Sequence, residues 1–354
     1  MADVAIAGAG VLGSAIAWRM AQAGHRVRVF DPTPGGLASP GSFAWLNASM
    51  AEDPVYNRLR HDSLSLWEAL KANDPTVPVK FPGAILWEQD HFDLDAIAGS
   101  QSDLGRPAQM LDDAELADRE PDVSNLPERA LLAGSDGYGD PEAITAWFLD
   151  QAKAAGAELI HAGITAINHD DARLKFVTAA DQSHPADYLI LAVGTKLPAM
   201  LALVEEDLTM NNTPGLLART SPGQGQITSM LATPNVHIWQ REDQGYLIGA
   251  DFGGGPPIED MDAGAEDVLQ KLQSVLAGTE DCRVENITVR ERPMPADGRP
   301  AIGPLGPEGL YVVSTHSGMT LAPVIAEMVT AEIGGQPDAR LDPYRPGRQT
   351  LQKS

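Results

Sequence analysis

Cysteine is nearly absent from this sequence, because Cys282 is the only one among its 354 residues. A single cysteine cannot form an internal disulfide, and it cannot supply a thiolate metal cluster. We interpret Cys282 as an inert small residue. The sequence also lacks an H-E-x-x-H pair, a spaced group of histidines and carboxylates, and a G-x-S-x-G turn. These absences argue against a metal site and against a serine nucleophile for acyl transfer.

Basic residues are also scarce. Lysine and arginine total 25 against 49 aspartate and glutamate residues, which gives a formal net charge of −24. A chain with this charge repels phosphate backbones and anionic lipid headgroups. We therefore expect a small-molecule partner rather than nucleic acid or a membrane surface, and the sequence leaves a homo-oligomer open.

Long hydrophobic runs are missing as well, and YLILAV at 188–193 is typical of those present. None approaches the length needed to span a membrane. The N-terminus passes from Met-Ala-Asp directly into VAIAGAG, without the basic or long apolar stretch of a targeting signal. These features predict a cytoplasmic protein without membrane insertion. The length of the chain, together with its 43% of apolar residues, predicts two domains with substantial cores.

The clearest local motif lies in the first thirty residues. VAIA at 4–7 predicts a buried parallel strand, and GAGVLG at 8–13 predicts a glycine turn. Apolar residues at helical spacing follow until Gly24, and HRVRVFDP at 25–32 predicts the next strand. A strand, G-x-G-x-x-G, a helix and a strand, with an acidic residue about twenty positions after the motif, form the pattern of a dinucleotide site.

Each residue of this motif has a physical role. Gly8 permits a tight turn, Gly10 lets the backbone approach a pyrophosphate, and Gly13 lets the helix and strand pack closely. The helix N-terminus offers N–H groups and the positive end of its dipole to the phosphates. Asp31 can accept hydrogen bonds from both ribose hydroxyls and would repel a ribose phosphate. The pattern therefore favours NAD or FAD over NADP.

The later segments distinguish NAD from FAD. A simple nicotinamide enzyme would continue with regular strands and helices, but a loop rich in glycine, serine and proline follows at 32–49. The remaining pattern predicts a helix at 57–70, a strand at 80–89, a helix and strand within 136–160, a buried strand within 184–195, a hairpin at 237–255, a helix at 267–278, and a strand, glycine turn and helix within 309–335. Asp140 would cap the helix of 136–160, with Pro141 at its first position. Nucleotide-domain segments thus alternate with β-rich insertions.

This order, with three particular stretches, resembles the D-amino-acid oxidase family of FAD enzymes, which includes glycine oxidase, sarcosine oxidase and D-amino acid dehydrogenases. The stretches are GAGVLGSAIAWRMAQAGHRVRVFD at 8–31, ADYLILAVGT at 186–195, and RPMPADGRPAIG at 292–303 followed by GLYVVSTHSGMTLAP at 309–323. The resemblance implies an α/β fold with an FAD-binding Rossmann-type domain and an interleaved antiparallel β-rich substrate domain. By this resemblance we expect an FAD-binding domain at 1–79, 136–210 and 286–354, and a substrate domain at 80–135 and 211–285.

The resemblance also implies the reaction and the cofactor contacts. The reaction would be oxidation of the C–N bond of an amino acid or secondary amine, by transfer of a hydride to flavin N5. The helix that starts near Gly318 should follow a strand lying beside the first one, so that its N–H groups stabilise negative charge on the flavin. The residues expected to contact FAD are Gly8, Gly10, Val11, Leu12, Gly13, Asp31, Pro32, Ser39, Ser42, Phe43, Ala44, Ile164, Ala192, Gly194, Ser317, Gly318, Met319, Thr320 and Leu321.

Arg292 is the main candidate for a substrate contact. In glycine oxidase the arginine of the pattern R-P-x-x-x-D-G-x-P-x-I-G binds the substrate carboxylate, and of the nearby arginines only Arg292 falls on it. A guanidinium is a planar fork that can donate two parallel hydrogen bonds to a carboxylate. The two prolines at 293 and 295 would stiffen the backbone, and Gly298 would allow a turn. His316 is a second catalytic candidate, because glycine oxidase has a basic residue there. Trp45 and Tyr246 are weaker candidates for the pocket wall, as is Trp239.

This sequence differs from the relatives at two places, and each difference changes what the resemblance implies. Sarcosine oxidases attach their flavin through a cysteine just upstream of this segment, where Val289, Arg290 and Glu291 stand here, so we expect non-covalent FAD. Relatives also carry a lysine associated with oxygen activation near Ala322, which leaves the electron acceptor open. Two alternatives remain: oxidation of a 2-hydroxy acid, in which His316 would be an essential base, and a flavin-carrying subunit without turnover of its own.

Overall fold

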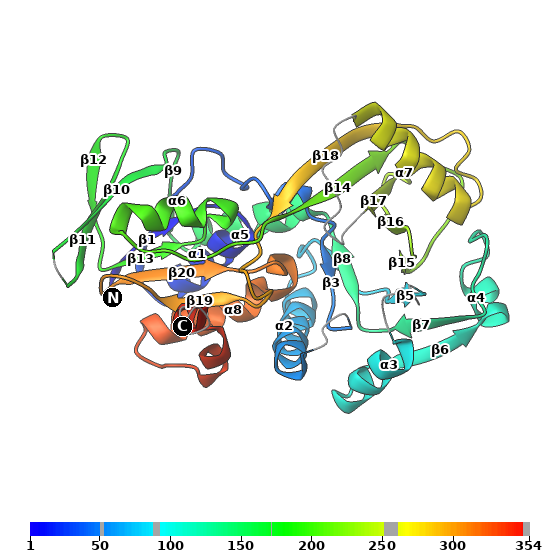
Figure 1. The fold of residues 1–354 in the computed structure, drawn as a ribbon, viewed down its shortest axis with the longest axis horizontal. Coiled ribbons are helices and arrows are strands. Elements are labelled where there is room, and N and C mark those ends of the chain that lie inside the picture. Colours follow the sequence, from blue (N-terminus) through cyan, green and yellow to red (C-terminus); the bar gives the residue numbers. More distant parts are fainter. Residues whose placement is uncertain (50–52, 88–92, 171, 251–260, 350–354) are drawn as a thin grey trace.

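Two large β-sheets divide the molecule into two lobes, which lie side by side in Figure 1. This computed structural model describes residues 1–49, 53–87, 93–170, 172–250 and 261–349. One lobe contains a six-stranded, mostly parallel sheet, and the other contains an eight-stranded, mostly antiparallel sheet. The predicted α/β class, with a Rossmann-type region and an antiparallel β-rich region, is confirmed.

The six-stranded sheet combines segments from both ends and the middle of the chain. In spatial order its strands are β19 (Ala301–Pro304), β20 (Leu310–Ser314), β13 (Tyr188–Leu191), β1 (Asp3–Ala7), β2 (Arg26–Phe30) and β9 (Glu158–Ile160). All neighbours are parallel except β19 and β20. The expectation that the strand before the last helix lies beside the first strand is wrong, because β13 pairs with both β1 and β20 and separates them.

Both faces of this sheet are covered, which explains why its strands are continuously apolar. Val4 and Ile6 face the core formed with α1 (Val11–Gln22), α2 (Pro54–Asn73), α5 (Pro141–Ala154) and α8 (Gly318–Ile333). Ala5 and Ala7 face the opposite way. That second face is covered by α6 (Leu197–Leu201) and by a three-stranded sheet of β10 (Ile164–His169), β11 (Leu174–Ala179) and β12 (Gln182–Pro185).

Capping residues set where the helices of this lobe begin. The Asp140 carboxylate accepts hydrogen bonds from the N–H groups of Glu142 and Ala143, at 3.0 and 2.9 Å, and Pro141 is the first helical residue. The predicted start of α5 is therefore confirmed. Asp53 caps α2 in the same way, again directly before a proline. Helices and strands predicted at 57–70, 267–278 and 309–335 are confirmed as α2, α7 (Met261–Val275), β20 and α8.

The eight-stranded sheet forms the second lobe. In spatial order its strands are β18 (Val284–Arg292), β14 (Thr213–Thr220), β17 (Tyr246–Ala250), β16 (Val236–Gln240), β15 (Met230–Ala232), β5 (Ala84–Leu86), β7 (Arg129–Ala133) and β6 (Ala108–Asp112). β16 and β17 form the predicted hairpin, whose last predicted residues, 251–255, lie outside the described residues. The helices α3 (Leu94–Asp103), α4 (Asp113–Arg119) and α7 complete this lobe (Figure 1).

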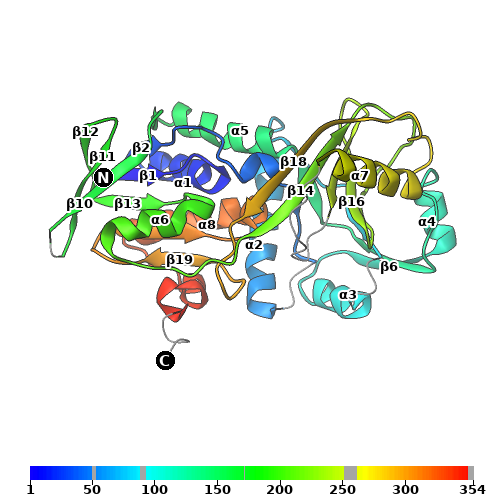
Figure 2. The ribbon, with the colours of Figure 1, turned by 45° about the horizontal axis from the view of Figure 1, so that its top comes forward.

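Two elements link the lobes. β14 and β18 run side by side from the second lobe to the first in Figure 2. β18 continues seven residues past the predicted domain boundary at 285, so that segment belongs to the second sheet; the division into domains itself stays a prediction. A small sheet is formed by β3 (Trp45–Leu46), β8 (Gly137–Gly139) and β4 (Val79–Lys80), and β3 and β8 lie between the lobes in Figure 1. Short 3-10 helices occur at Ser39–Gly41, Gly194–Lys196, Ala202–Val204, Ala339–Tyr344 and Pro346–Gln349.

Candidate active site

A cavity of about 1020 Å³ brings together residues of both sheets, β3 and the start of α8. Its walls include most of the residues predicted from the sequence. The predicted site residues that line it are Gly8, Gly10, Val11, Leu12, Asp31, Pro32, Ser39, Ser42, Phe43, Ala44, Trp45, Ile164, Ala192, Gly194, Arg292, His316, Ser317, Gly318, Met319 and Thr320. Segments more than 300 residues apart in sequence therefore meet around one space, although the role of each residue there stays a prediction.

Three predicted residues do not line the cavity. Gly13 lies against the carbonyl oxygen of Gly8, where any Cβ would overlap it, so this glycine lets α1 pack on β1. Leu321 is fully buried in the helical core. The expectation that Tyr246 projects into the pocket is wrong, because its ring is fully buried in the core of the second lobe and its hydroxyl donates to the carbonyl oxygen of Gly225 at 2.6 Å. Trp239 is likewise buried, and its Nε1 donates to Phe43.

The glycine turn after β1 is held in the form that the motif predicts. Gly8 has a φ of +100°, and a Cβ there would overlap the carbonyl oxygen of Ala192. Gly36 approaches Gly10 so closely that a Cβ on Gly36 would lie 2.9 Å from the Gly10 Cα. The Ser39 hydroxyl accepts the first N–H of α1, from Val11, at 3.0 Å. Backbone can pass this closely only because side chains are absent.

Asp31 is fixed at the end of β2 beside this turn. Its carboxylate accepts hydrogen bonds from the N–H of Ala9 at 2.7 Å and from that of Thr33 at 2.8 Å, one on each oxygen. It is 8% exposed and lines the cavity. Each carboxylate oxygen has a further lone pair. Asp31 can thus accept hydroxyl protons of a ribose while the turn stays in place.

The N-terminus of α8 borders the same cavity beside the start of α1, because a Cβ on Gly318 would lie 3.5 Å from the Val11 side chain. The first N–H groups of an α-helix lack acceptors within the helix, and here these belong to Gly318, Met319 and Thr320, which line the cavity. Helix α2 fixes this turn from behind. Ser63 donates to the carbonyl oxygen of Thr320 at 2.6 Å, and Trp67 Nε1 donates to that of Met319 at 3.2 Å.

Arg292 reaches the cavity because successive side chains of strand β18 point to opposite faces of the sheet. Val289 packs against the core of the second lobe, whereas Arg290 and Arg292 point to the opposite face and line the cavity. The Arg292 guanidinium lies across Gly215, where a Cβ would be 3.0 Å from Nε, and its Nη2 donates to the carbonyl oxygen of Pro214 at 2.7 Å. The neighbouring strand therefore provides the room for this side chain and holds one of its nitrogens.

The segment after Arg292 is braced by backbone pairing. The carbonyl oxygen of Met294 accepts the N–H of Asn211 at 2.7 Å, and Ala296 donates to Thr209 at 3.0 Å. Gly298 has a φ of +75°, and its N–H closes a turn on Pro295 at 2.8 Å. The predicted glycine turn is thus confirmed. The stiffness of the frame comes from antiparallel pairing as well as from its prolines.

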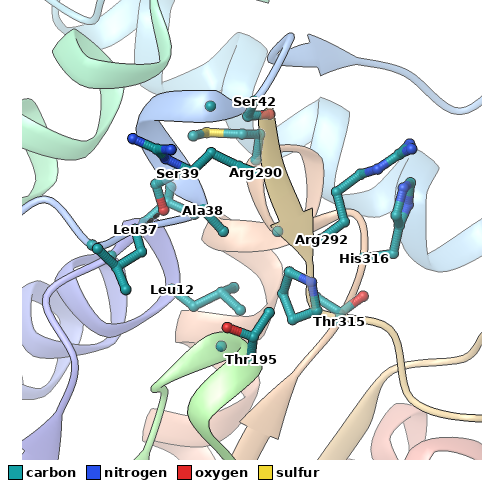
Figure 3. A pocket seen from close by; sticks show the side chains of 18 of the residues that line it. Leu12, Leu37, Ala38, Ser39, Ser42, Thr195, Arg290, Arg292, Thr315 and His316 are labelled. Carbon is teal, nitrogen blue, oxygen red and sulfur yellow. Dashed lines mark hydrogen bonds between the residues drawn. The ribbon is translucent and has the colours of Figure 1, made fainter. Parts of the chain in front are cut away.

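The two arginines of β18 diverge. In Figure 3 the Arg292 side chain extends toward His316, while that of Arg290 extends toward Ser39. The stem of Arg290 passes Gly41, where a Cβ would overlap its Cγ. Arg299 forms an ion pair with Asp53 at 2.5 Å and does not line the cavity. Arg292 is therefore the arginine of this segment that lies beside the histidine.

The environment of His316 is strongly cationic. Its ring is accessible through the cavity, yet protein surrounds it elsewhere, and this desolvation, followed by the charges of Arg292 and Arg60, lowers the pKa of His316 to about 4. Arg60, from α2, is 7% exposed and also lines the cavity. The imidazole is therefore neutral at physiological pH, and the positive charges of Arg292 and Arg60 both act on it.

Trp45 is positioned by a buried carboxylate. Its Nε1 donates to Oδ2 of Asp136 at 3.0 Å, and Ser49 donates to the same oxygen at 2.6 Å. Desolvation raises the pKa of Asp136 to about 6, despite these hydrogen bonds and the charge of Arg60. The ring of Trp45 packs edge-on against His237, with centroids 5.3 Å apart. Trp45, Phe43 and His237 form an aromatic part of the cavity wall.

Several cavity residues were not predicted from the sequence, among them Arg60, Asn47, Tyr56, Gly215 and His237. One of them carries a recognisable signal. Arg60 lies four and seven residues before Leu64 and Trp67, and so on the buried face of an amphipathic helix, where an arginine is rarely found without a specific contact. His237 and Gly215 belong to strands whose pairing only the fold reveals.

The described part of the chain contains neither a metal-binding cluster nor a membrane-spanning helix. Within it, no group of three or more histidine, cysteine and carboxylate side chains is placed to hold a metal ion. No described helix is long and apolar enough to cross a membrane. Cys282 is buried and unpaired with another cysteine.

Comparison with known proteins adds a family and a fold. A family model described as FAD dependent oxidoreductase matches residues 3–332. Glycine oxidase of Bacillus licheniformis is 23% identical over 347 residues, which cover 95% of this chain and 94% of that protein. The crystal structure of glycine oxidase from Geobacillus kaustophilus superposes with a TM-score of 0.88 at 23% identity, covering 98% of both chains. An L-amino acid deaminase from Proteus vulgaris gives the same TM-score at 19% identity, covering 98% of this chain and 94% of the other.

Proposed function

Since this chain belongs to the family of FAD-dependent oxidoreductases, we propose that it oxidises the C–N bond of a small amino acid or secondary amine that carries a carboxylate. The single observation that carries this proposal is the Arg292 guanidinium, presented to the cavity across Gly215. A planar cation in a largely apolar wall suits a carboxylate. The related glycine oxidases and amino acid deaminases, by their names, act on molecules of this class.

The residues of the cavity fit FAD. The close approach of Gly10 and Gly36 leaves a side-chain-free cradle beside the N-terminus of α1, which would hold the pyrophosphate. Asp31 would accept the ribose hydroxyls, and the N–H groups at the start of α8 would face the pyrimidine edge of the flavin. When bound, FAD supplies the two-electron acceptor for the substrate.

The protein's own contribution is orientation. Arg292 would bind the carboxylate through its fork and so fix the position of the carbon that loses hydrogen. Pro214, Gly215 and the paired segment at 293–296 hold that fork in place. Phe43 and Trp45 would exclude water from the same region.

Oxidation of a 2-hydroxy acid is less well supported. That reaction needs a base that accepts the hydroxyl proton. His316 is the candidate, but burial and two neighbouring arginines lower its pKa to about 4, which makes it a weak base at neutral pH. A neutral amine has a lone pair that assists the departure of the hydride, and the proton of its ammonium form can be lost to water, so the protein need not supply a base.

An anaerobic reduction screen tests the proposed function. Purified protein would be mixed without oxygen with glycine, N-methylglycine, proline, D- and L-amino acids and 2-hydroxy acids, and flavin absorbance followed. We expect bleaching with at least one amino acid and none with hydroxy acids. Bleaching by hydroxy acids alone would establish the other reaction, and no bleaching by any compound would favour a subunit without turnover.

Two finer features belong to this proposal. We expect FAD to be bound non-covalently, because Val289, Arg290 and Glu291 stand where sarcosine oxidases have their attachment cysteine. Acid precipitation should then release all flavin into the supernatant, and yellow colour in the pellet would refute this.

We also propose a cytoplasmic location, in keeping with a chain whose one cysteine is buried and forms no disulfide. Cell fractionation tests it.

A further inference from the structure

A chain of polar side chains runs from α2 to the histidine of the cavity. Arg60 donates from Nε to the backbone oxygen of Asn47 at 2.9 Å, from Nη2 to the Asn47 side-chain oxygen, and from Nη1 to the Ser317 hydroxyl at 2.9 Å. A guanidinium has donors only. The Ser317 oxygen is therefore the acceptor in the contact with Arg60, and its own hydrogen is directed elsewhere.

The hydrogen of Ser317 has one acceptor in reach among the contacts of the described residues. Nδ1 of His316 lies 3.4 Å from the Ser317 oxygen. If Ser317 donates to Nδ1, that nitrogen carries no proton, and a neutral imidazole must then carry its proton on Nε2. The charged groups acting on the ring are both cations, Arg60 from α2 and Arg292 from β18, so they oppose a second proton.

We infer that Arg60 and Ser317 hold His316 as the neutral Nε2–H tautomer, which makes this ring a hydrogen-bond donor to the substrate carboxylate beside Arg292. Arg60 and Ser317 are positioning residues in this arrangement. The inference about the substrate rests on the proposed function, whereas the tautomer itself does not. Figure 3 shows Arg292 extending toward His316, so one carboxylate can lie within reach of both.

The arrangement has a chemical purpose. A neutral donor adds a hydrogen bond to the carboxylate without adding another positive charge beside Arg60 and Arg292. Because Nδ1 is occupied by Ser317, the ring also has no free lone pair to remove a proton. His316 therefore cannot act as the base that oxidation of a 2-hydroxy acid requires.

Nitrogen-15 NMR of histidine-labelled holoenzyme tests the tautomer without any substrate. Comparison with His316→Gln assigns the signals. We expect a neutral ring protonated at Nε2 from pH 7 down to about pH 5. Ser317→Ala should shift the ring toward a mixture of tautomers, and Ser317→Thr, which keeps a hydroxyl, should restore the wild-type signals. A ring protonated at Nδ1, or a doubly protonated ring at pH 7, would overturn the inference.

Kinetics with the substrate found by the reduction screen test the donor role. His316→Phe removes the donor and should raise KM about tenfold or more, with a smaller change in kcat, because hydrogen bonds to charged groups are strong. His316→Gln keeps an N–H donor and should recover part of the loss. An unchanged KM in His316→Phe would refute the donor role even where the tautomer is confirmed. If the screen finds no substrate, the proposed function fails while the NMR result stands.

Discussion

At the scale of single residues, Arg292 carries the substrate proposal. Arg292→Ala should leave folding and flavin content intact, because the side chain supports neither lobe's core. It should lower kcat/KM by about two to four orders of magnitude, since a desolvated carboxylate without its partner costs about 3 to 5 kcal/mol. Arg292→Lys should recover only part of the lost kcat/KM, because an ammonium group keeps the positive charge but cannot donate two parallel hydrogen bonds as the planar guanidinium does. Steady-state kinetics and flavin absorbance measure both.

A neighbouring arginine provides the control for this series. Arg299 lies seven residues later, pairs with Asp53 on the surface, and is about half exposed. Arg299→Ala should therefore change kcat/KM little. The carboxylate role would be wrong if Arg292→Ala oxidised its amino acid within about threefold of wild type. A loss confined to substrates with a carboxylate, with amines still oxidised, would instead identify Arg292 as the source of acid specificity.

Asp136 gives a prediction about pH. Its pKa is raised to about 6 in the folded protein, so the unfolded chain binds fewer protons at this residue and stability falls as pH rises between about 4 and 6. Asp136→Asn removes this dependence on pH, because an amide does not titrate. Its side-chain oxygen can still accept hydrogen bonds from Ser49 and Trp45, so the local structure is kept. Relative to wild type, the variant should gain unfolding free energy across this window, by at most about 3 kcal/mol, and then level off.

Urea unfolding at a series of pH values measures that difference. Asp118→Asn, on the exposed side of α4, serves as the surface control for removal of one acid. A difference between Asp136→Asn and wild type that stays constant from pH 4 to 8 would mean that the carboxylate does not titrate in this range. If this difference in unfolding free energy fell as pH rose, the pKa of Asp136 would be lowered in the folded protein, as expected for a carboxylate held charged by Arg60.

The residue scale also shows what sequence can and cannot reveal. Arg292 was predictable because its role is tied to a local pattern of prolines and glycines. Arg60 and Asp136 were missed, because each acts through partners distant in sequence, Ser317 and Trp45 respectively. Tyr246 was misplaced for a similar reason. Alternation along a strand gives two faces, and only the packing of α7 decides which face is the core.

At the scale of elements, the turn between β1 and α1 sets the cofactor site. Gly10→Val should abolish flavin binding, because its side chain would stand against Gly36 and Ser39 in the cradle proposed for the pyrophosphate. The absorbance ratio of flavin to protein after purification measures this. Gly99→Ala, on α3, is the matched control, because a Cβ there meets nothing within 4 Å. Normal flavin content in folded Gly10→Val would place the cofactor elsewhere.

Most elements were predictable from local chemistry, and their spatial order was less so. The Asp140-Pro141 start of α5 and the glycine turn before α1 depend on neighbours within a few residues. The place of β20 in its sheet depends instead on β13, more than a hundred residues away in sequence. No local sequence pattern distinguishes a strand that pairs directly with β1 from a strand that is separated from β1 by another strand. Sheet order is decided by long-range pairing.

At the scale of the whole molecule, two fields act on an approaching FAD. The net charge of −24 repels its pyrophosphate at long range. The cavity wall attracts it at short range, through Arg60, Arg290, Arg292 and two helix N-termini. Salt screens the long-range field first, because the Debye length falls from about 30 Å at 0.01 M to about 8 Å at 0.15 M. The net charge therefore predicts that added salt speeds FAD binding, whereas the cations of the cavity predict that added salt slows it.

We expect the long-range field to govern association, since the rate of encounter is set at distances where the net charge dominates. The rate constant for FAD binding to apoprotein should then rise several-fold between 0.01 and 0.15 M salt. Stopped-flow quenching of flavin fluorescence measures it, and sodium chloride and potassium sulfate at equal ionic strength should agree, because screening depends on ionic strength alone. A rate constant that fell with salt would show that the cations of the cavity reach FAD before the acidic surface does, and that the site steers its own cofactor despite the charge around it.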